Sequence, residues 1–117
     1  MHFQVIKDNY YERILEKIDE FFPTFCSIYD NEDGIYPILG ELGIYIIENF
    51  EYEEIKKSTI IFINEAIDQG GAKTEDVIVL QLFQKIYEND KYSNQIRELL
   101  NQKAFEVFDK YFKIRCK

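Results

Sequence analysis

The apolar residues of this chain recur at intervals of three and four positions, and this spacing constrains the fold more than any other feature. In the segment before Pro23, charged residues fill the positions between the apolar ones. The apolar stripe consists of Tyr10, Tyr11, Ile14, Leu15, Ile18, Phe21 and Phe22. This pattern predicts an amphipathic helix of about 16 residues, which Pro23 ends because proline disfavours helix continuation.

The segment from Pro37 to Phe50 is apolar on nearly all sides, which predicts a helix in the middle of the fold. Pro37 suits a first helical turn. Gly40 and Gly43 lower helix propensity by about 1 kcal/mol each, and we expect them to allow a neighbouring helix to approach closely. Because residues 43–50 are rich in Ile and Tyr, a strand is the alternative for this part.

Three further helical patterns follow. One lies in EYEEIKKSTIIFINEAIDQGG, residues 51–71, carries Glu53 and Glu54 in its first turn, and stops at Gly70–Gly71. The next is expected to be capped by Thr74, with an inner face of Val77, Leu80, Phe83 and Tyr87 that is widened by Ile78, Val79, Leu82 and Ile86. Residues 91–117 predict one long or bent helix with a basic end, where the helix dipole favours the cations Lys110, Lys113, Arg115 and Lys117.

The expected fold class is therefore all-α, an irregular bundle of five to six helices. Short connections make consecutive helices antiparallel neighbours, so stacked antiparallel helix pairs are the alternative arrangement. A length of 117 residues suits a single domain over residues 1–117.

Charge limits the classes of partner. Residues 1–90 hold 7 basic and 19 acidic residues, whereas residues 91–117 hold 7 basic and 3 acidic, which together give the net charge of −8. An acidic body repels nucleic acid and anionic membranes and suits a basic protein. No secretory leader or membrane-spanning run is evident, so we expect a cytoplasmic protein with Cys26 and Cys116 as reduced thiols.

The residue types that carry catalysis are scarce. His2 is the only histidine, and two widely spaced cysteines complete no zinc or triad pattern. We therefore expect no enzyme activity, no metal and no cofactor. One enzymatic alternative is a magnesium-dependent all-α nucleotide pyrophosphatase, whose paired acids would be Glu51 and Glu54 with Glu65 and Asp68. Both pairs fall on one predicted helix about 21 Å apart, so they could share an ion only if the chain broke between them.

The stretch YDNEDGIY, residues 29–36, resembles the start of a calcium loop. Placing Gly34 at loop position 6 puts Tyr29 at position 1 and Gly40 at position 12. Those positions require Asp and a bidentate Glu, so we reject a calcium hand.

Two acidic clusters edged by tyrosine remain, and they flank the apolar helix 37–50 at ends about 20 Å apart. Acids steer a basic partner and tyrosines supply buried area, so these clusters are the predicted partner-binding residues. They are Tyr29, Asp30, Glu32, Asp33 and Tyr36 in the first cluster, and Glu51, Tyr52, Glu53 and Glu54 in the second. The alternative is a pair of solvated loops whose tyrosines lean on the core.

The Phe-Pro that ends the first helix, together with the run PILGELGIYIIENFEYEEIKKSTIIFINEAIDQGGAKTEDVIVLQLFQKI, resembles a group of small acidic all-helical bacterial proteins. This group is found among the immunity proteins of polymorphic toxin systems and their relatives, and the resemblance covers about residues 21–87. It implies a non-enzymatic protein that neutralises a cognate toxin by direct binding. The alternative function is a self-associating regulatory or structural helical module, for example a homodimer.

Overall fold

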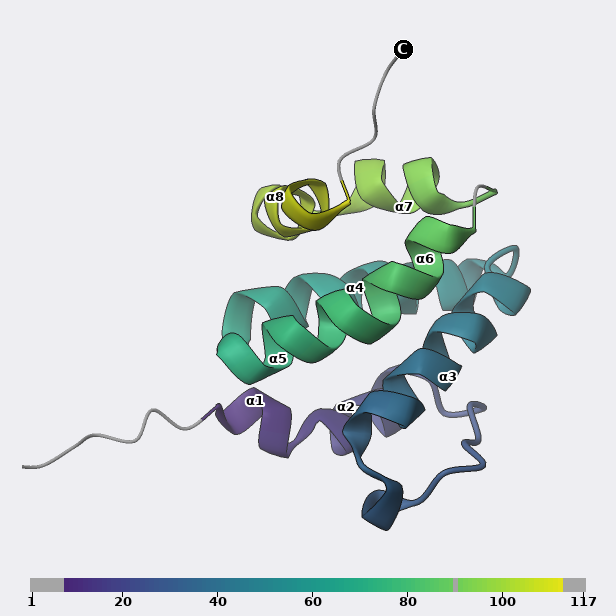
Figure 1. Cartoon of the computed structure of the whole chain (residues 1–117). Coiled ribbons are helices and arrows are strands. Elements are labelled where there is room, and N and C mark those ends of the chain that lie inside the picture. The colour runs from purple at the N-terminus through teal and green to yellow at the C-terminus, as the bar shows by residue number, and fades with distance from the viewer. Residues whose placement is uncertain (1–7, 90, 113–117) are drawn as a thin grey trace, which may run out of the picture.

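The computed structural model describes residues 8–89 and 91–112, and every regular element in this range is helical (Figure 1). The elements are α1 (Asn9–Glu12), α2 (Ile14–Phe21), the 3₁₀ turn η1 (Asn31–Asp33), α3 (Ile35–Asn49), α4 (Glu53–Gln69), α5 (Ala72–Val77), the π-helix η2 (Ile78–Phe83), α6 (Gln84–Glu88), α7 (Ser93–Leu99) and α8 (Gln102–Tyr111). The prediction of an all-α fold is confirmed. The strand alternative for residues 43–50 is wrong, because this segment lies almost wholly inside α3.

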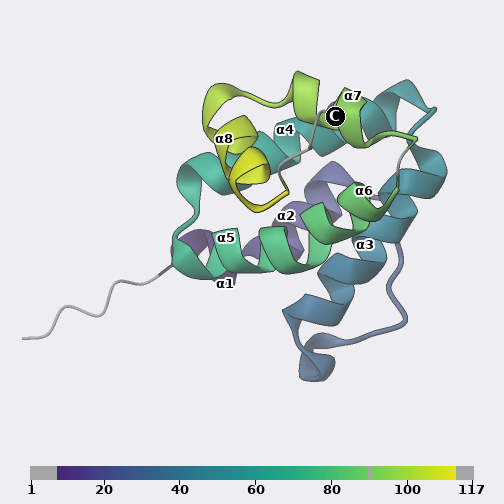
Figure 2. The ribbon, with the colours of Figure 1, turned by 45° about the horizontal axis from the view of Figure 1, so that its top comes forward.

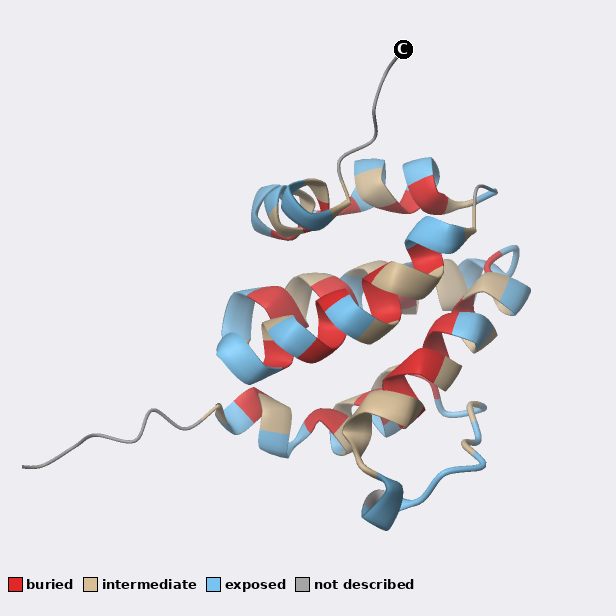
Figure 3. Cartoon of the chain, viewed as in Figure 1, coloured by how far each residue is buried: buried red, intermediate tan, exposed pale blue. Residues whose placement is uncertain are grey.

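The continuous stretch α5–η2–α6 crosses the middle of the molecule, beside α4 (Figures 1 and 2). Its π-helical part packs mainly against α3, and α4 packs against α2 and α8. Buried faces of these elements turn toward one another (Figure 3) and form one apolar core. Its largest fully buried side chains include Phe22, Phe50, Phe62, Phe83 and Phe108.

The glycines of α3 allow the close approach that the sequence predicted. A Cβ atom on Gly43 would lie 2.8 Å from the Cβ of Lys85, and one on Gly40 would lie 2.8 Å from Oε1 of Gln81. Both distances are shorter than real side-chain contacts permit. Gly43 therefore sets how closely α3 packs against α6, because the Lys85 atoms that it meets lie next to the backbone, whereas Oε1 of Gln81 is the end of a flexible side chain.

The first predicted helix is divided at Arg13 into α1 and α2. The two halves have different main neighbours, since α1 packs against α5 and α2 packs against α4, although Tyr10 of α1 also reaches Glu65 on α4. Polar bonds hold α1 in place: the Tyr10 hydroxyl donates to Oε2 of Glu65 at 2.8 Å, and Asp8 binds Thr74. These long-range bonds explain a break that the local apolar pattern did not indicate.

The predicted inner face of the helix after Gly71 was wrong at two positions. Leu80 and Tyr87 are exposed, whereas Ile78, Val79, Leu82 and Ile86 are buried with Val77 and Phe83. The buried residues Ile78, Leu82 and Ile86, like Val79 and Phe83, are four apart and share one side of the helix, so the predicted face was centred on the wrong side.

Two helix boundaries also differ from the prediction. Thr74 does not cap the helix, since α5 begins at Ala72 and Thr74 is buried within its first turn. The tail forms α7 and α8 with a break at Leu100, and the Asn101 side chain accepts a hydrogen bond from the Ala104 N–H at 2.9 Å. His2, Lys113, Arg115, Cys116 and Lys117 lie outside the described residues. Among the residues that the structure describes, no helix has the length and apolar character needed to span a membrane.

Candidate functional site

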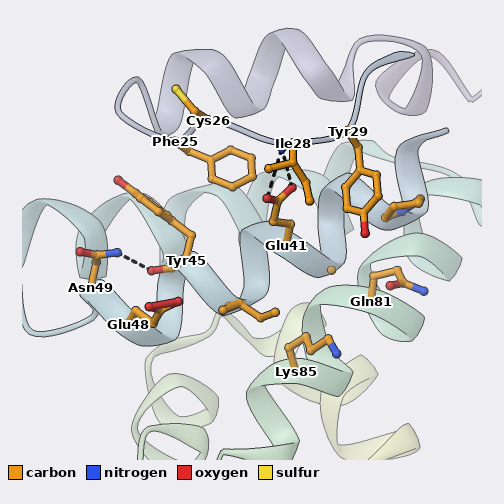
Figure 4. A pocket seen from close by; sticks show the side chains of 13 residues that line it. Phe25, Cys26, Ile28, Tyr29, Glu41, Tyr45, Glu48, Asn49, Gln81 and Lys85 are labelled. Carbon is orange, nitrogen blue, oxygen red and sulfur yellow. Dashed lines mark hydrogen bonds between the residues drawn. The ribbon is translucent and has the colours of Figure 1, made fainter. Parts of the chain in front are cut away.

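The outer side of α3 carries a groove of about 650 Å³. Its floor is α3, one wall is the segment between Phe25 and Tyr29, and the other wall is formed by Gln81 and Lys85 (Figure 4). Its apolar lining comes mainly from Phe25, Ile28, Tyr29, Ile44 and Tyr45.

Two smaller hollows continue this groove. One of about 340 Å³ shares Ile44, Glu48 and Lys85 with it. The other, of about 470 Å³, shares Tyr45 and Asn49 and extends to Tyr52, Glu53 and Glu54. We call the three hollows together the α3 groove. It follows α3 over most of the helix length.

The carboxylate of Glu41 holds the loop that forms one wall of the groove. It accepts hydrogen bonds from the Ser27 hydroxyl and from the backbone N–H of Ile28, the latter at 3.2 Å to each oxygen (Figure 4). On the same loop, Phe25 packs against the Tyr45 ring with centroids 5.3 Å apart, and the Thr24 hydroxyl bonds the Tyr45 hydroxyl. The loop is therefore fixed to α3, and it presents the Ile28 side chain 85% exposed.

The first predicted acidic cluster forms a self-contained turn before α3. Oδ1 of Asp30 accepts the N–H of Glu32 at 2.9 Å, and Oδ2 of Asp33 accepts the N–H of Asp30 at 3.0 Å. Two of the three acids thus stabilise the turn, while Glu32 is exposed. Gly34 follows at a φ of +91°, a backbone conformation that other residues rarely adopt. Tyr29 lines the groove and is 40% exposed.

Tyr36 is used inside the fold. Its hydroxyl donates a hydrogen bond to Oδ2 of Asp76 on α5, and its ring packs against the core. That hydrogen bond, together with burial and the Asp76 charge, raises the pKa of Tyr36 to about 12. Tyr36 therefore connects the start of α3 to α5.

The second predicted cluster lies at the other end of α3. Glu51 pairs with Lys91, whose Nζ lies 3.3 Å from Oε1, and accepts a bond from the Tyr92 hydroxyl at 3.3 Å. Hydrogen bonds to Tyr92 and Glu51, with the charges of both groups, raise the pKa of Lys91. Glu53 pairs with Lys56 at 3.7 Å.

The remaining members of this cluster line the groove. Tyr52 is 66% exposed and borders it with Glu53 and Glu54. No described cation lies within ion-pair distance of Glu54, nor of Glu48 in the middle of the groove.

The structure thus places the two predicted clusters at opposite ends of α3, and Tyr29 from the first cluster and Tyr52, Glu53 and Glu54 from the second line the α3 groove. Tyr36 and Glu51 make contacts within the fold, whereas Tyr29 and Tyr52 lie at the surface. Sequence reasoning missed Ile28, Ile44 and Glu48. The apolar, all-round pattern of residues 38–50 assigned Ile44 to the core, and only the packing of α3 shows which of its sides is open.

The pyrophosphatase alternative required a break in the helix that carries its acids. α4 is continuous from Glu53 to Gln69, so Glu54 and Asp68 lie about 21 Å apart along one axis. Among the described residues, no three His, Cys, Asp or Glu side chains gather closely enough to hold a metal ion.

Comparisons with known proteins add no family and no fold relative: no family model, no curated protein and no solved structure matches the chain.

Proposed function

We propose that this protein is a non-enzymatic binding protein that neutralises a basic bacterial toxin domain by direct contact, as an immunity protein does. The observation that supports the proposal is the α3 groove, a largely apolar surface that Glu48, Glu53 and Glu54 line and that Tyr29 joins to the acidic turn of residues 30–33. Acidic groups around an apolar centre are suited to steer a basic protein and then bury aromatic and aliphatic area. The sequence resemblance to immunity-type proteins supports the same function.

Three of the acids are free to act on a partner. Glu32, Glu48 and Glu54 are exposed and make no ion pair with any described residue. Asp30 and Asp33 are less suitable for mutation, since their carboxylates hold the turn. Charge reversal at Glu32 and Glu54 therefore tests steering without dismantling the loop.

Self-association through this face is the less favourable alternative. A symmetric dimer through this face would bring the acidic residues of one copy close to those of the other, and like charges across an interface oppose association. Sedimentation of the purified chain distinguishes the two functions. A stable homodimer that involves the α3 groove contradicts the proposal.

The experiment is co-expression of this chain with any neighbouring gene whose product is toxic when it is expressed alone. We expect cell protection and a stoichiometric complex on size-exclusion chromatography. The double variant E32K/E54K should slow association by about tenfold at low salt, because rim charges act mainly on the association rate. The matched control E12K/E98K changes net charge equally on α1 and α7 and should have a much smaller effect. Absence of both protection and complex would overturn the proposal.

A further inference from the structure

We infer that the π-helix η2 is a register device built into the fold, which accommodates one residue more than an α-helix would hold between α5 and α6. It thereby allows one continuous helix, residues 72–88, to keep a single buried face along its length. The inference is independent of the proposed function. Three observations carry it: the hydrogen-bond spacing, the spacing of the buried residues, and the fixed contacts before and after η2.

The hydrogen-bond spacing changes within this helix. The Ile78 N–H donates to the carbonyl of Thr74, four residues earlier, as in an α-helix. The Gln84 N–H donates to the carbonyl of Val79, five residues earlier. A turn with this wider bond contains about one residue more than an α-helical turn. Ile78 and Gln84 both keep right-handed helical backbone angles, so the chain stays helical through the change.

The buried residues are spaced as in an α-helix that has gained one residue. They are Thr74, Val77, Ile78, Val79, Leu82, Phe83 and Ile86. Counted from Thr74, Val77 and Ile78 fall at i+3 and i+4, the positions that share one face of an α-helix. Leu82 and Phe83 fall at i+8 and i+9, whereas that face requires i+7 and i+8. The excess is one residue, and it lies inside η2.

Contacts on both sides of η2 fix the rotation of the helix. Before η2, the Asp8 carboxylate accepts hydrogen bonds from the N–H and the hydroxyl of Thr74. After η2, the Phe83 ring packs against the Phe108 ring of α8 with centroids 4.9 Å apart. One residue corresponds to about 100° of rotation in an α-helix. Uninterrupted α geometry would therefore turn Phe83 away from α8 while Thr74 faced Asp8, and η2 removes this conflict.

Leu80 is the residue of η2 whose side chain the core uses least. It is 53% exposed, whereas Val79 is 5% exposed. Without Leu80, the buried pair Leu82 and Phe83 moves to i+7 and i+8 from Thr74, so an unbroken α-helix satisfies the contacts on both sides. Val79 turns toward solvent in that helix, and the loss of its burial is the expected cost.

The test is deletion of Leu80 from the full chain, with deletion of Ile61 as the matched control. Ile61 is 44% exposed and lies in α4, where the α-helix is continuous, so its loss rotates the buried residues that follow it. We expect the Leu80 deletion to melt cooperatively within about 10 °C of wild type. The Ile61 deletion should melt at least about 15 °C lower or lose its cooperative transition.

A second variant changes the register at the same place in the opposite direction. An alanine inserted after Leu80 raises the excess to two residues, and we expect it to destabilise the protein as strongly as the Ile61 deletion does. NMR supplies the structural readout for the Leu80 deletion. Nuclear Overhauser contacts between the rings of Phe83 and Phe108 and slow hydrogen exchange of the Thr74 N–H should both persist.

Four outcomes overturn the inference. These are an unfolded Leu80 deletion, equal losses from the deletions of Leu80 and Ile61, equal tolerance of the deletion and the insertion at Leu80, and a folded Leu80 deletion that has lost either the Phe83–Phe108 contact or the protection of Thr74. Because every measurement uses the purified chain alone, the result does not depend on whether the chain binds a toxin.

Discussion

Asp8 and Thr74 are 66 positions apart in the chain, yet the Asp8 carboxylate binds Thr74 twice. Oδ2 accepts the Thr74 N–H at 2.7 Å, and Oδ1 accepts the Thr74 hydroxyl at 2.8 Å. Oδ1 also accepts the N–H of Tyr11 at 3.0 Å. One carboxylate therefore caps α1 and satisfies the first turn of α5.

Replacing Asp8 with Ala should lower the free energy of unfolding by about 2 kcal/mol, because the variant loses a helix cap and leaves buried donors of Thr74 unsatisfied. The matched control is Asp30→Ala, which removes a similar turn-forming carboxylate from an exposed loop and should cost about 0.5 kcal/mol. Urea denaturation measures both. Equal effects of the two substitutions would show that the Asp8–Thr74 contact contributes little.

The Asp8 carboxylate should also make the free energy of unfolding depend on pH. Burial alone would raise the pKa of Asp8, but hydrogen bonds from the Thr74 and Tyr11 N–H groups and the Thr74 hydroxyl outweigh it and lower the pKa below 3.8. The stabilisation is therefore present above the ordinary value and is lost as the pH falls through the folded-state pKa. We expect the stability gap between wild type and Asp8→Asn to narrow below about pH 4. A gap that does not change with pH would contradict this assignment.

The Tyr36 hydroxyl should make the protein less stable at high pH, the opposite direction to Asp8. Its pKa is raised to about 12, so its contribution to stability is complete below pH 10 and is lost as the pH rises toward 12. Tyr36→Phe should cost about 1 kcal/mol at neutral pH, the value of one hydrogen bond, and little at the alkaline end. Thermal melts from pH 7 to pH 11 follow this difference. Asp76→Asn serves as a control, since it keeps an acceptor and removes the charge.

The two glycines of α3 should respond differently to alanine. At Gly43 a Cβ meets the Cβ and Cγ of Lys85, which are close to the backbone, so the helices must separate at a cost of about 1–3 kcal/mol. At Gly40 the nearest atom is the terminal Oε1 of Gln81, which can swing aside. Gly40→Ala should therefore be neutral or stabilise by up to about 1 kcal/mol through helix propensity. Thermal denaturation compares the two, and similar losses at both sites would disprove this view of the contact.

Loss of the Glu41 carboxylate should loosen the loop of residues 24–30 and leave the global fold intact. Glu41→Ala removes the acceptor for the Ser27 hydroxyl and the Ile28 N–H, so limited proteolysis should cut within residues 24–30 several-fold faster. The free energy of unfolding should fall by only about 1 kcal/mol. The control is Glu48→Ala, an exposed acid of the same groove that holds no loop. Unchanged cleavage in Glu41→Ala would show that the aromatic contact of Phe25 with Tyr45 holds the loop alone.

The periodicity of apolar residues in the sequence was sufficient to predict most of the helices and the fold class. The limits of α3 and α4 fell within about two residues of those expected, because a proline, a pair of glycines and a first-turn acid are local signals that act within one or two turns. The same logic failed at Arg13 and in η2. At both places, contacts with distant segments determine the helix geometry. A local sequence pattern carries no information about those contacts.

For the candidate site, the sequence by itself determined that acids and tyrosines gather at both ends of one apolar helix. Only the tertiary structure decided which side of α3 stays open, that Ile28 is presented there by Glu41, and that Tyr36 points into the fold. The physical reason is that a helix apolar on all sides has no preferred outer face of its own. Its exposed side is whichever one the remaining helices, once packed against Gly40 and Gly43, leave uncovered.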